Sequence, residues 1–174
     1  MEPDDKRAIL AELDNGKDAL LGALVGVTED MAPRVPAPGR WSVLECVEHV
    51  AVAEDCLFSS IVASCPAASP MVNSSREAAI LLRAVDCANK RESPDVARPK
   101  GRYGSLGAAV EAFLAGRMRT TQFVLDSSDD LRSMQTTHPI MGDVNCYEVL
   151  LLMAVHPRRH AAQIDEIKAA LAVA

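Results

Sequence analysis

The chain has four histidines, and two of them have the spacing that lets both rings bind one metal ion. His156 and His160 are four residues apart, which places their rings one turn apart on the same face of a helix. Leu152, Met153 and Ile164 lie on that face as well, so both rings should enter the protein interior. Because a buried imidazole needs a partner for each nitrogen, this pair is a candidate for metal coordination.

A third histidine has a similar setting. His49 lies between Val47 and Val50 on a second apolar helix face. Three neutral imidazoles that leave one coordination position open are typical of a catalytic site for zinc, nickel or a related divalent ion. The alternative is that carboxylates such as Glu45 or Glu54 satisfy these rings, which then only pack.

Glu45 and Cys46, which precede His49 in the sequence, could take part in such a site. Glu45 precedes His49 by one turn and could orient an imidazole or act as a general base, although a role in capping the helix already explains it. Cys46 lies on nearly the same face and could be a fourth ligand, but a free cysteine is more often a core residue.

Three residues on the last predicted helix are further candidates. Gln163 follows His160 by three residues and could hydrogen-bond a metal ligand, a bound water or a loop carbonyl, or could simply pack. Arg158 and Arg159 could bind an anionic substrate, such as the carboxylates of a thiol cofactor. A solvated face is the favoured interpretation for both arginines.

Helical segments must position these residues, and proline, glycine and capping residues divide the chain into five of them. The predicted helices cover residues 3 to about 27, 42 to about 64, 78 to 88, 105 to about 125, and 145 to 171. Residues 93–104 and the polar segment around Asp129 and Asp130 are expected to be loops. Gly16 is expected to be a weak point of the first helix.

Side chains that can cap helices precede four of the predicted segments. Ser42 with Glu45, and Ser74 with Glu77, have the spacing of a capping box. Asn145 with Glu148 should cap the last helix, and Ser105 can cap the fourth.

The composition indicates one all-helical domain spanning residues 1–174. A chain of 174 residues can bury about 70% of its unfolded surface around a single core. The apolar fraction is 49% but aromatic residues make up only 3%, so the core must consist of Leu, Val, Ala, Ile and Met. This mixture suits helices packed on helices.

Charge and hydropathy bear on the classes of partner. A net charge of -6 and a pI of about 5.2 argue against a nucleic-acid partner. The sequence shows neither an apolar run long enough to span a bilayer nor the start of a signal peptide, so we expect no membrane partner and a cytoplasmic location. The five cysteines form no CxxC motif and are interpreted as small buried hydrophobes.

Three motifs resemble those of the DinB-like superfamily. Its WSxxExxxH signature is similar to WSVLECVEH at residues 41–49, and its HxxRHxxQI helix is similar to HPRRHAAQI at residues 156–164. An HPxxG loop found in part of the family resembles HPIMG at residues 138–142. The order and separation of the three motifs match over most of the chain.

The resemblance implies a four-helix bundle with additional short segments, and one divalent ion, zinc or nickel, held by His49, His156 and His160. Relatives include metal-dependent thiol transferases and thiol-dependent isomerases that use mycothiol, bacillithiol or glutathione.

A departure from the family pattern is Pro157, which should kink the helix beside the ligands. His138 is not expected to be a ligand, because it precedes the last helix by several residues.

Two function classes follow. The first is a metal-dependent transferase of a low-molecular-weight thiol, or a hydrolase, acting on a small molecule. The second is a non-catalytic helical module stabilised by the metal, in stress response or as a homodimeric interaction protein. A polar-lined pocket beside the metal would favour the first, and an exposed apolar patch would favour the second.

Overall fold

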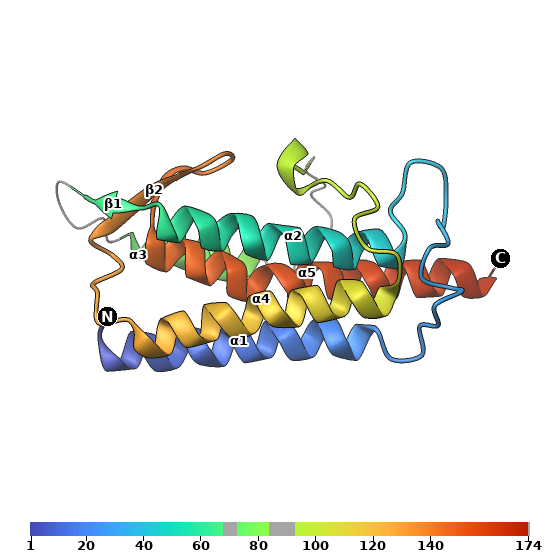
Figure 1. Cartoon of the computed structure of the whole chain (residues 1–174), viewed down its shortest axis with the longest axis horizontal. Coiled ribbons are helices and arrows are strands. Elements are labelled where there is room, and N and C mark those ends of the chain that lie inside the picture. The colour runs from blue at the N-terminus through green and yellow to red at the C-terminus, as the bar shows by residue number, and fades with distance from the viewer. Residues whose placement is uncertain (68–72, 84–92, 174) are drawn as a thin grey trace.

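Within residues 1–67, 73–83 and 93–173, which the computed structural model describes, four long helices lie side by side (Figure 1). These are α1 (Pro3–Ala23), α2 (Val43–Val62), α4 (Leu106–Asp126) and α5 (Cys146–Val173). The smaller elements are α3 (Ser74–Arg83), the 3-10 helix η1 (Asp95–Ala97) and the strands β1 (Cys65–Pro66), β2 (Met134–His138) and β3 (Gly142–Asn145). This arrangement confirms the predicted all-α four-helix bundle. No helix among the described residues is long and apolar enough to cross a membrane.

The long helices do not simply alternate in direction. In Figure 1, α1 and α5 run one way while α2 and α4 run the other, and α1 packs on α5 as α2 packs on α4. Two neighbours that run parallel cannot be joined by a short turn, so the chain between α2 and α4 must return along the bundle. This return segment carries α3 and η1, and η1 contacts α2.

Most of the predicted caps are present. Ser42 Oγ accepts from the Glu45 amide at 3.2 Å while Glu45 Oε2 accepts from the Ser42 amide at 2.8 Å. Asn145 and Glu148 make the same reciprocal pair at 2.8 and 3.0 Å. These bonds satisfy backbone donors that the first turn of a helix leaves unpaired.

The third helix differs from its prediction at its start. The Asn73 side chain, and not Ser74, accepts from the Arg76 amide at 2.9 Å, so the helix begins earlier than residue 78. Glu77 contacts Arg132 instead of completing a capping box. The predicted residues 84–88 lie outside the described residues.

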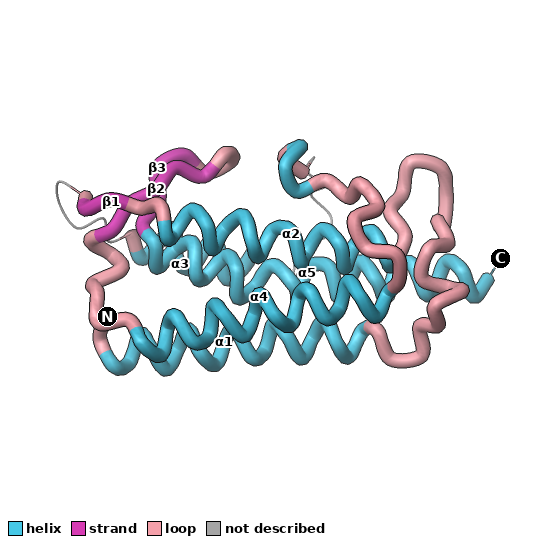
Figure 2. Tube along the Cα trace, viewed as in Figure 1, coloured by secondary structure: helices cyan, strands magenta, loops and turns pink. Residues whose placement is uncertain are grey.

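A small antiparallel sheet was not predicted. Strand β2 pairs with β1 and with β3, and β2 and β3 form a hairpin whose turn ends at Gly142 with a φ of 71°. The strand residues Met134–His138 lack the apolar alternation that marks a half-buried strand, which is why the segment reads as a polar loop. Figure 2 shows that the hairpin and η1 lie on the same side of the bundle, over α2.

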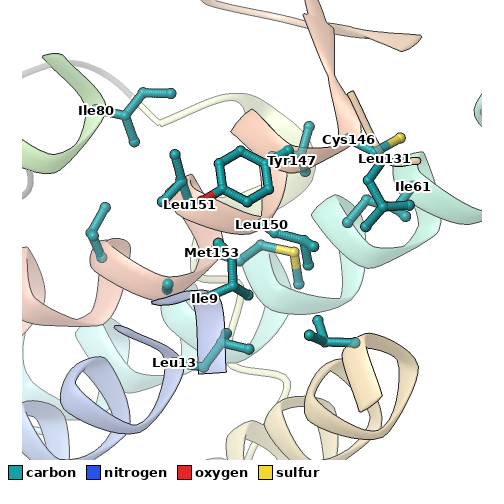
Figure 3. Packing of buried hydrophobic residues seen from close by; sticks show 14 of the residues in the cluster. Ile9, Leu13, Ile61, Ile80, Leu131, Cys146, Tyr147, Leu150, Leu151 and Met153 are labelled. Carbon is teal, nitrogen blue, oxygen red and sulfur yellow. The ribbon is translucent and has the colours of Figure 1, made fainter. Parts of the chain in front are cut away.

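Two apolar clusters fill the bundle from its two ends. The first contains Ile9, Leu13, Leu150 and Met153 and lies under the sheet and α3 (Figure 3). The second lies toward the C-terminal end of α5 and includes Leu20, Val43, Val47, Phe113 and Ile164. On α5 the first cluster ends at Val155 and the second begins at Ala161. Between them the bundle has a polar middle layer.

Gly16 belongs to this middle layer and corrects one expectation. A Cβ at Gly16 would lie 2.0 Å from the Ala154 carbonyl oxygen of α5, a separation that real atoms never adopt. The glycine is therefore required for the close approach of α1 to α5, and is not merely a weak point of a helix.

Candidate metal centre

Three histidine rings converge where α2 crosses the middle of α5. His156 Nε2 lies 3.2 Å from His49 Nε2 and 3.0 Å from His160 Nε2. His49, His156 and His160 are close enough to share one metal ion, because their candidate ligand atoms all lie within 4.8 Å of one another. Among the His, Cys, Asp and Glu side chains of the described residues, these three form the group that meets this condition. The structure thus brings together the three histidines that the sequence singled out.

His49 and His160 lie on either side of His156, and each is oriented through its second ring nitrogen, Nδ1. His49 Nδ1 lies 2.7 Å from the Ala97 carbonyl oxygen, and His160 Nδ1 lies 3.1 Å from Gln163 Oε1. Both partners are acceptors, so each Nδ1 carries the proton and each Nε2 presents a lone pair. This is the arrangement by which neighbouring groups orient metal-binding histidines.

Burial keeps the three rings neutral. It lowers the pKa of His49 below the ordinary value, and it lowers the pKa values of His156 and His160 much further. The positive charge of Arg159 lowers the pKa of both helix-α5 histidines in addition. Neutral imidazole is the form that binds a metal ion.

The spacing of the nitrogens fits a metal ion. His49 and His160 each direct an Nε2 lone pair toward His156 Nε2, and lone pairs at this distance repel one another unless a cation lies among the three nitrogens or neutral His156 carries its one proton on Nε2. A tetrahedral zinc ion with Zn–N bonds of about 2.0–2.1 Å separates its ligand nitrogens by about 3.3 Å. The observed 3.0 and 3.2 Å are close to that value.

Trp41 covers the rings from the side of the α1–α2 connection. Its ring centroid lies 5.0 Å from that of His49, and it stacks on His160 at 6.2 Å with an interplanar angle of 20°. The aromatic surface restricts the rings to one orientation. Trp41 belongs to the motif noted in the sequence, but only the structure shows that it contacts two of the histidines.

Glu48 is an important residue that the sequence did not reveal. Its buried carboxylate accepts from the amides of Lys100 at 2.6 Å, Gly101 at 3.1 Å and Arg102 at 3.2 Å, and from the Arg102 guanidinium at 3.0 Å. Burial alone would raise the pKa of Glu48, but these hydrogen bonds hold it below its ordinary value. They attach residues 93–104 to α2, so the Ala97 carbonyl is held against His49. The only local signal for Glu48 in the sequence is its position immediately before the predicted ligand His49.

Glu45 and Cys46 have partners other than the imidazoles. The Glu45 carboxylate takes part in the capping box with Ser42, and the group that accepts from His49 is the Ala97 carbonyl. Cys46 is fully buried in the second apolar cluster, and burial raises the pKa of its thiol. The metal-competent group found among the described residues does not include it.

The two candidate arginines face different surroundings. Arg158 Nη1 donates to Glu12 of α1 at 3.2 Å, which satisfies the guanidinium outside the site. Arg159 lines a cleft beside the histidines, and Gln163 lines the same cleft. Adjacent residues on a helix point about 100° apart, which explains why one arginine reaches the site and the other does not.

The cleft opens beside the three rings between the hairpin and the return segment. It encloses about 1440 Å³, enough for a small organic molecule, and its walls include Trp41, Val96, Ile140 and Leu152. His138 also lines it. The amides of Ile140 and Met141 donate to His138 Nδ1, both at 3.2 Å, so the remaining ring donor is Nε2–H.

The position of His138 depends on the hairpin. His138 precedes the last helix by several residues, but the hairpin that carries it folds back over α2 (Figure 1). This fold returns His138 to the wall of the cleft. Among the described residues it still lies outside the group of three histidines.

Fold and site together define a class: a helical bundle with a three-histidine centre at the base of a cleft. The model of the DinB superfamily matches residues 12–164, and the chain belongs to that superfamily. This confirms the resemblance noted in the sequence.

The solved structures that are similar in fold include one with a functional description. It is that of YfiT from Bacillus subtilis, described as a probable metal-dependent hydrolase with an unusual four-helix bundle topology. The TM-score is 0.60 at 16% identity, over 99% of this chain and 90% of that one. At this identity the likeness shows the fold alone. No curated protein matches the sequence.

Proposed function

We propose that this protein is a metal-dependent enzyme that holds one divalent ion, zinc or nickel, on His49, His156 and His160. The observation that carries the proposal is the convergence of three neutral Nε2 atoms, two of them with their Nδ1–H groups already engaged. Three histidine ligands leave a coordination position open, as in catalytic sites.

The reaction we propose is attack by a metal-activated nucleophile on a small electrophile. Bound at this site, a divalent ion lowers the pKa of a water or of a substrate thiol, so that a nucleophile is available at neutral pH. Transfer of a low-molecular-weight thiol is the more specific form. Hydrolysis is the neighbouring form, and the description of YfiT as a probable hydrolase supports it.

The chain's own groups have separable tasks in either reaction. The Ala97 carbonyl and Gln163 keep two rings oriented. Arg159 supplies positive charge at the cleft wall for an anionic part of the substrate, and His138 offers Nε2–H as a donor. The apolar walls bind the rest of the molecule.

The alternative is a non-catalytic module that the metal only stabilises. A purely structural zinc site is usually closed by four protein ligands. Here the three histidines line an open cleft that also contains charged and hydroxyl side chains, which favours the enzyme.

Metal analysis followed by a turnover screen tests the proposal. We expect about one zinc or nickel ion per chain after reconstitution. We expect turnover of an electrophile with bacillithiol, mycothiol, glutathione or water as acceptor, and His49→Ala should abolish it. Circular dichroism should show that His49→Ala keeps its helical content, because the apolar clusters hold the bundle.

Three outcomes would contradict the proposal in different ways. A metal content near zero would exclude the centre. Turnover that survives loss of His49 would exclude metal-centred chemistry. A fully loaded protein inactive with every acceptor would support the non-catalytic module.

A further inference from the structure

Pro157 leaves a gap in the hydrogen bonding of α5 beside the metal centre. It lies inside the helix, directly after His156. Proline has no backbone N–H, so the carbonyl of Met153, four residues earlier, lacks the donor that a regular helix would provide. Met153 is buried, and a buried carbonyl without a donor is costly.

Arg117 of α4 supplies the missing donor. Its Nη2 donates to the Met153 carbonyl at 2.8 Å, and its Nη1 donates to the Leu13 carbonyl of α1 at 2.8 Å. Its Nε and Nη2 also donate to the Glu54 carboxylate of α2 at 3.1 and 2.9 Å. One buried guanidinium therefore joins all four long helices at the level of Pro157.

We propose that Arg117 is a positioning residue for the metal centre, because it replaces the backbone donor that Pro157 removes. By holding the Met153 carbonyl, it fixes the turn of α5 that ends in His156 and leads into His160. The inference rests on the proposed function, since it concerns the ion that the histidines would hold.

The geometry explains why this turn needs support. A helix that contains an uncompensated proline bends away from the freed carbonyl. A bend between Met153 and Pro157 would swing His160 relative to His49 on the facing helix. Metal sites tolerate errors of only about 0.2 Å in ligand distance, so a small bend would separate the Nε2 atoms too far.

A lysine at position 117 tests the role of the guanidinium. Arg117→Lys keeps a positive charge beside Glu54, but the three donors of one ammonium nitrogen cannot replace the four hydrogen bonds that the planar guanidinium makes to Glu54, Leu13 and Met153. We expect this variant to bind Zn²⁺ at least about tenfold more weakly than the wild type, measured by competition with a chelator.

Pro157→Ala provides the matched background. In this variant the backbone amide of residue 157 can donate to the Met153 carbonyl without help from Arg117. Adding Arg117→Lys to Pro157→Ala should therefore weaken Zn²⁺ binding by less than about threefold. The band positions of bound Co²⁺ should shift with Arg117→Lys only when Pro157 is present. An equal loss of Zn²⁺ affinity in both backgrounds, or no loss in either, would overturn the inference.

A control separates positioning from the ion pair itself. Glu54→Gln removes one charge but leaves the donor to Met153, so it should lower the melting temperature while Zn²⁺ affinity stays within about threefold. If Arg117→Lys fails to fold, Arg117→Met combined with Glu54→Met removes both buried charges and is measured in the same two backgrounds.

Amide hydrogen exchange in metal-free protein gives a readout independent of the ion. The amides of residues 158–160 should exchange at least about tenfold faster in Arg117→Lys than in wild type, and this difference should vanish with Ala at 157. A wild type that binds no Zn²⁺ would refute the proposed function. The exchange data would then still decide whether Arg117 supports the turn of α5 at Pro157.

Discussion

At the scale of single residues, each outer histidine uses one nitrogen to fix its ring and keeps the other for the shared centre. The Ala97 carbonyl and the Gln163 side-chain oxygen accept hydrogen bonds from the Nδ1–H groups of His49 and His160. Because these partners set the tautomer, the same contacts decide the position of each ring and which of its nitrogens carries the proton.

His160 and His138 provide a matched pair of substitutions. We expect His160→Ala to weaken Zn²⁺ binding by more than about 100-fold, because it removes a ligand and not only an outer partner. His138→Ala should change it by less than about threefold, since this ring lies at the cleft wall outside the group of three. Calorimetric titration of both variants makes the comparison, and equal losses would mean that the hairpin supplies a ligand.

Arg159 and Arg158 are a second matched pair, on adjacent positions of α5. We expect Arg159→Gln to raise KM for a carboxylate-bearing thiol such as glutathione about tenfold with kcat little changed, because it removes a charge that binds substrate. Arg158→Gln loses the partly exposed pair with Glu12 and should leave KM unchanged. Steady-state kinetics decide it, and a similar rise in both variants would exclude a specific role for Arg159.

At the scale of elements, the return segment between α2 and α4 is also part of the site. Because these helices run parallel, the chain has to pass back along the bundle, and Glu48 attaches this passage to α2. The Ala97 carbonyl reaches His49 for that reason. A connection that topology requires thus orients a ligand of the proposed metal ion.

The packing of α1 on α5 is tested by two glycines of α1. A Cβ at Gly16 would meet the Ala154 carbonyl at 2.0 Å, so Gly16→Ala should destabilise the protein by about 1–3 kcal/mol or more as the helices move apart. At Gly22 no heavy atom of the described residues lies within 4 Å of such a Cβ, so Gly22→Ala should stabilise the helix by up to about 1 kcal/mol. Denaturant unfolding measures both, and a neutral Gly16→Ala would show that the two helices separate without cost.

At the scale of the whole molecule, a polar layer divides the apolar interior. Arg117, Glu54 and Thr120 lie between the two apolar clusters and are bonded to one another or to carbonyls. Each cluster packs well by itself, while the layer between them requires specific partners. The histidine centre lies beside this layer, where helix positions are most strictly defined.

The stability of the metal-free protein should depend on pH because of the buried histidines. Their pKa values are lowered in the folded protein, whereas in the unfolded chain they lie near 6.5. Below pH 6.5 the unfolded chain therefore binds more protons, so the free energy of unfolding should fall as pH falls, by up to about 1.4 kcal/mol per pH unit for each ring that stays neutral.

Denaturant unfolding between pH 7.5 and 5, with chelator present, measures this slope. His160→Gln should reduce it, because one fewer group changes protonation on unfolding. A free energy of unfolding that does not change over this range would show that the rings are not held neutral.

Local patterns in the sequence were enough to determine the helices, most of their caps and the three histidines. Helix periodicity, the Ser42–Glu45 box and the spacing of His156 and His160 all depend on residues within about one turn of one another, where backbone geometry leaves few choices.

Only the tertiary structure decided which groups surround the histidines. The parallel neighbours, the hairpin that returns His138, the contact of Ala97 with His49 and the bond from Arg117 to Met153 join residues far apart in the chain. No spacing rule relates such residues, because their proximity follows from how whole helices pack and cross. The sequence could show that Pro157 frees a carbonyl, but only the packed bundle shows which side chain binds it.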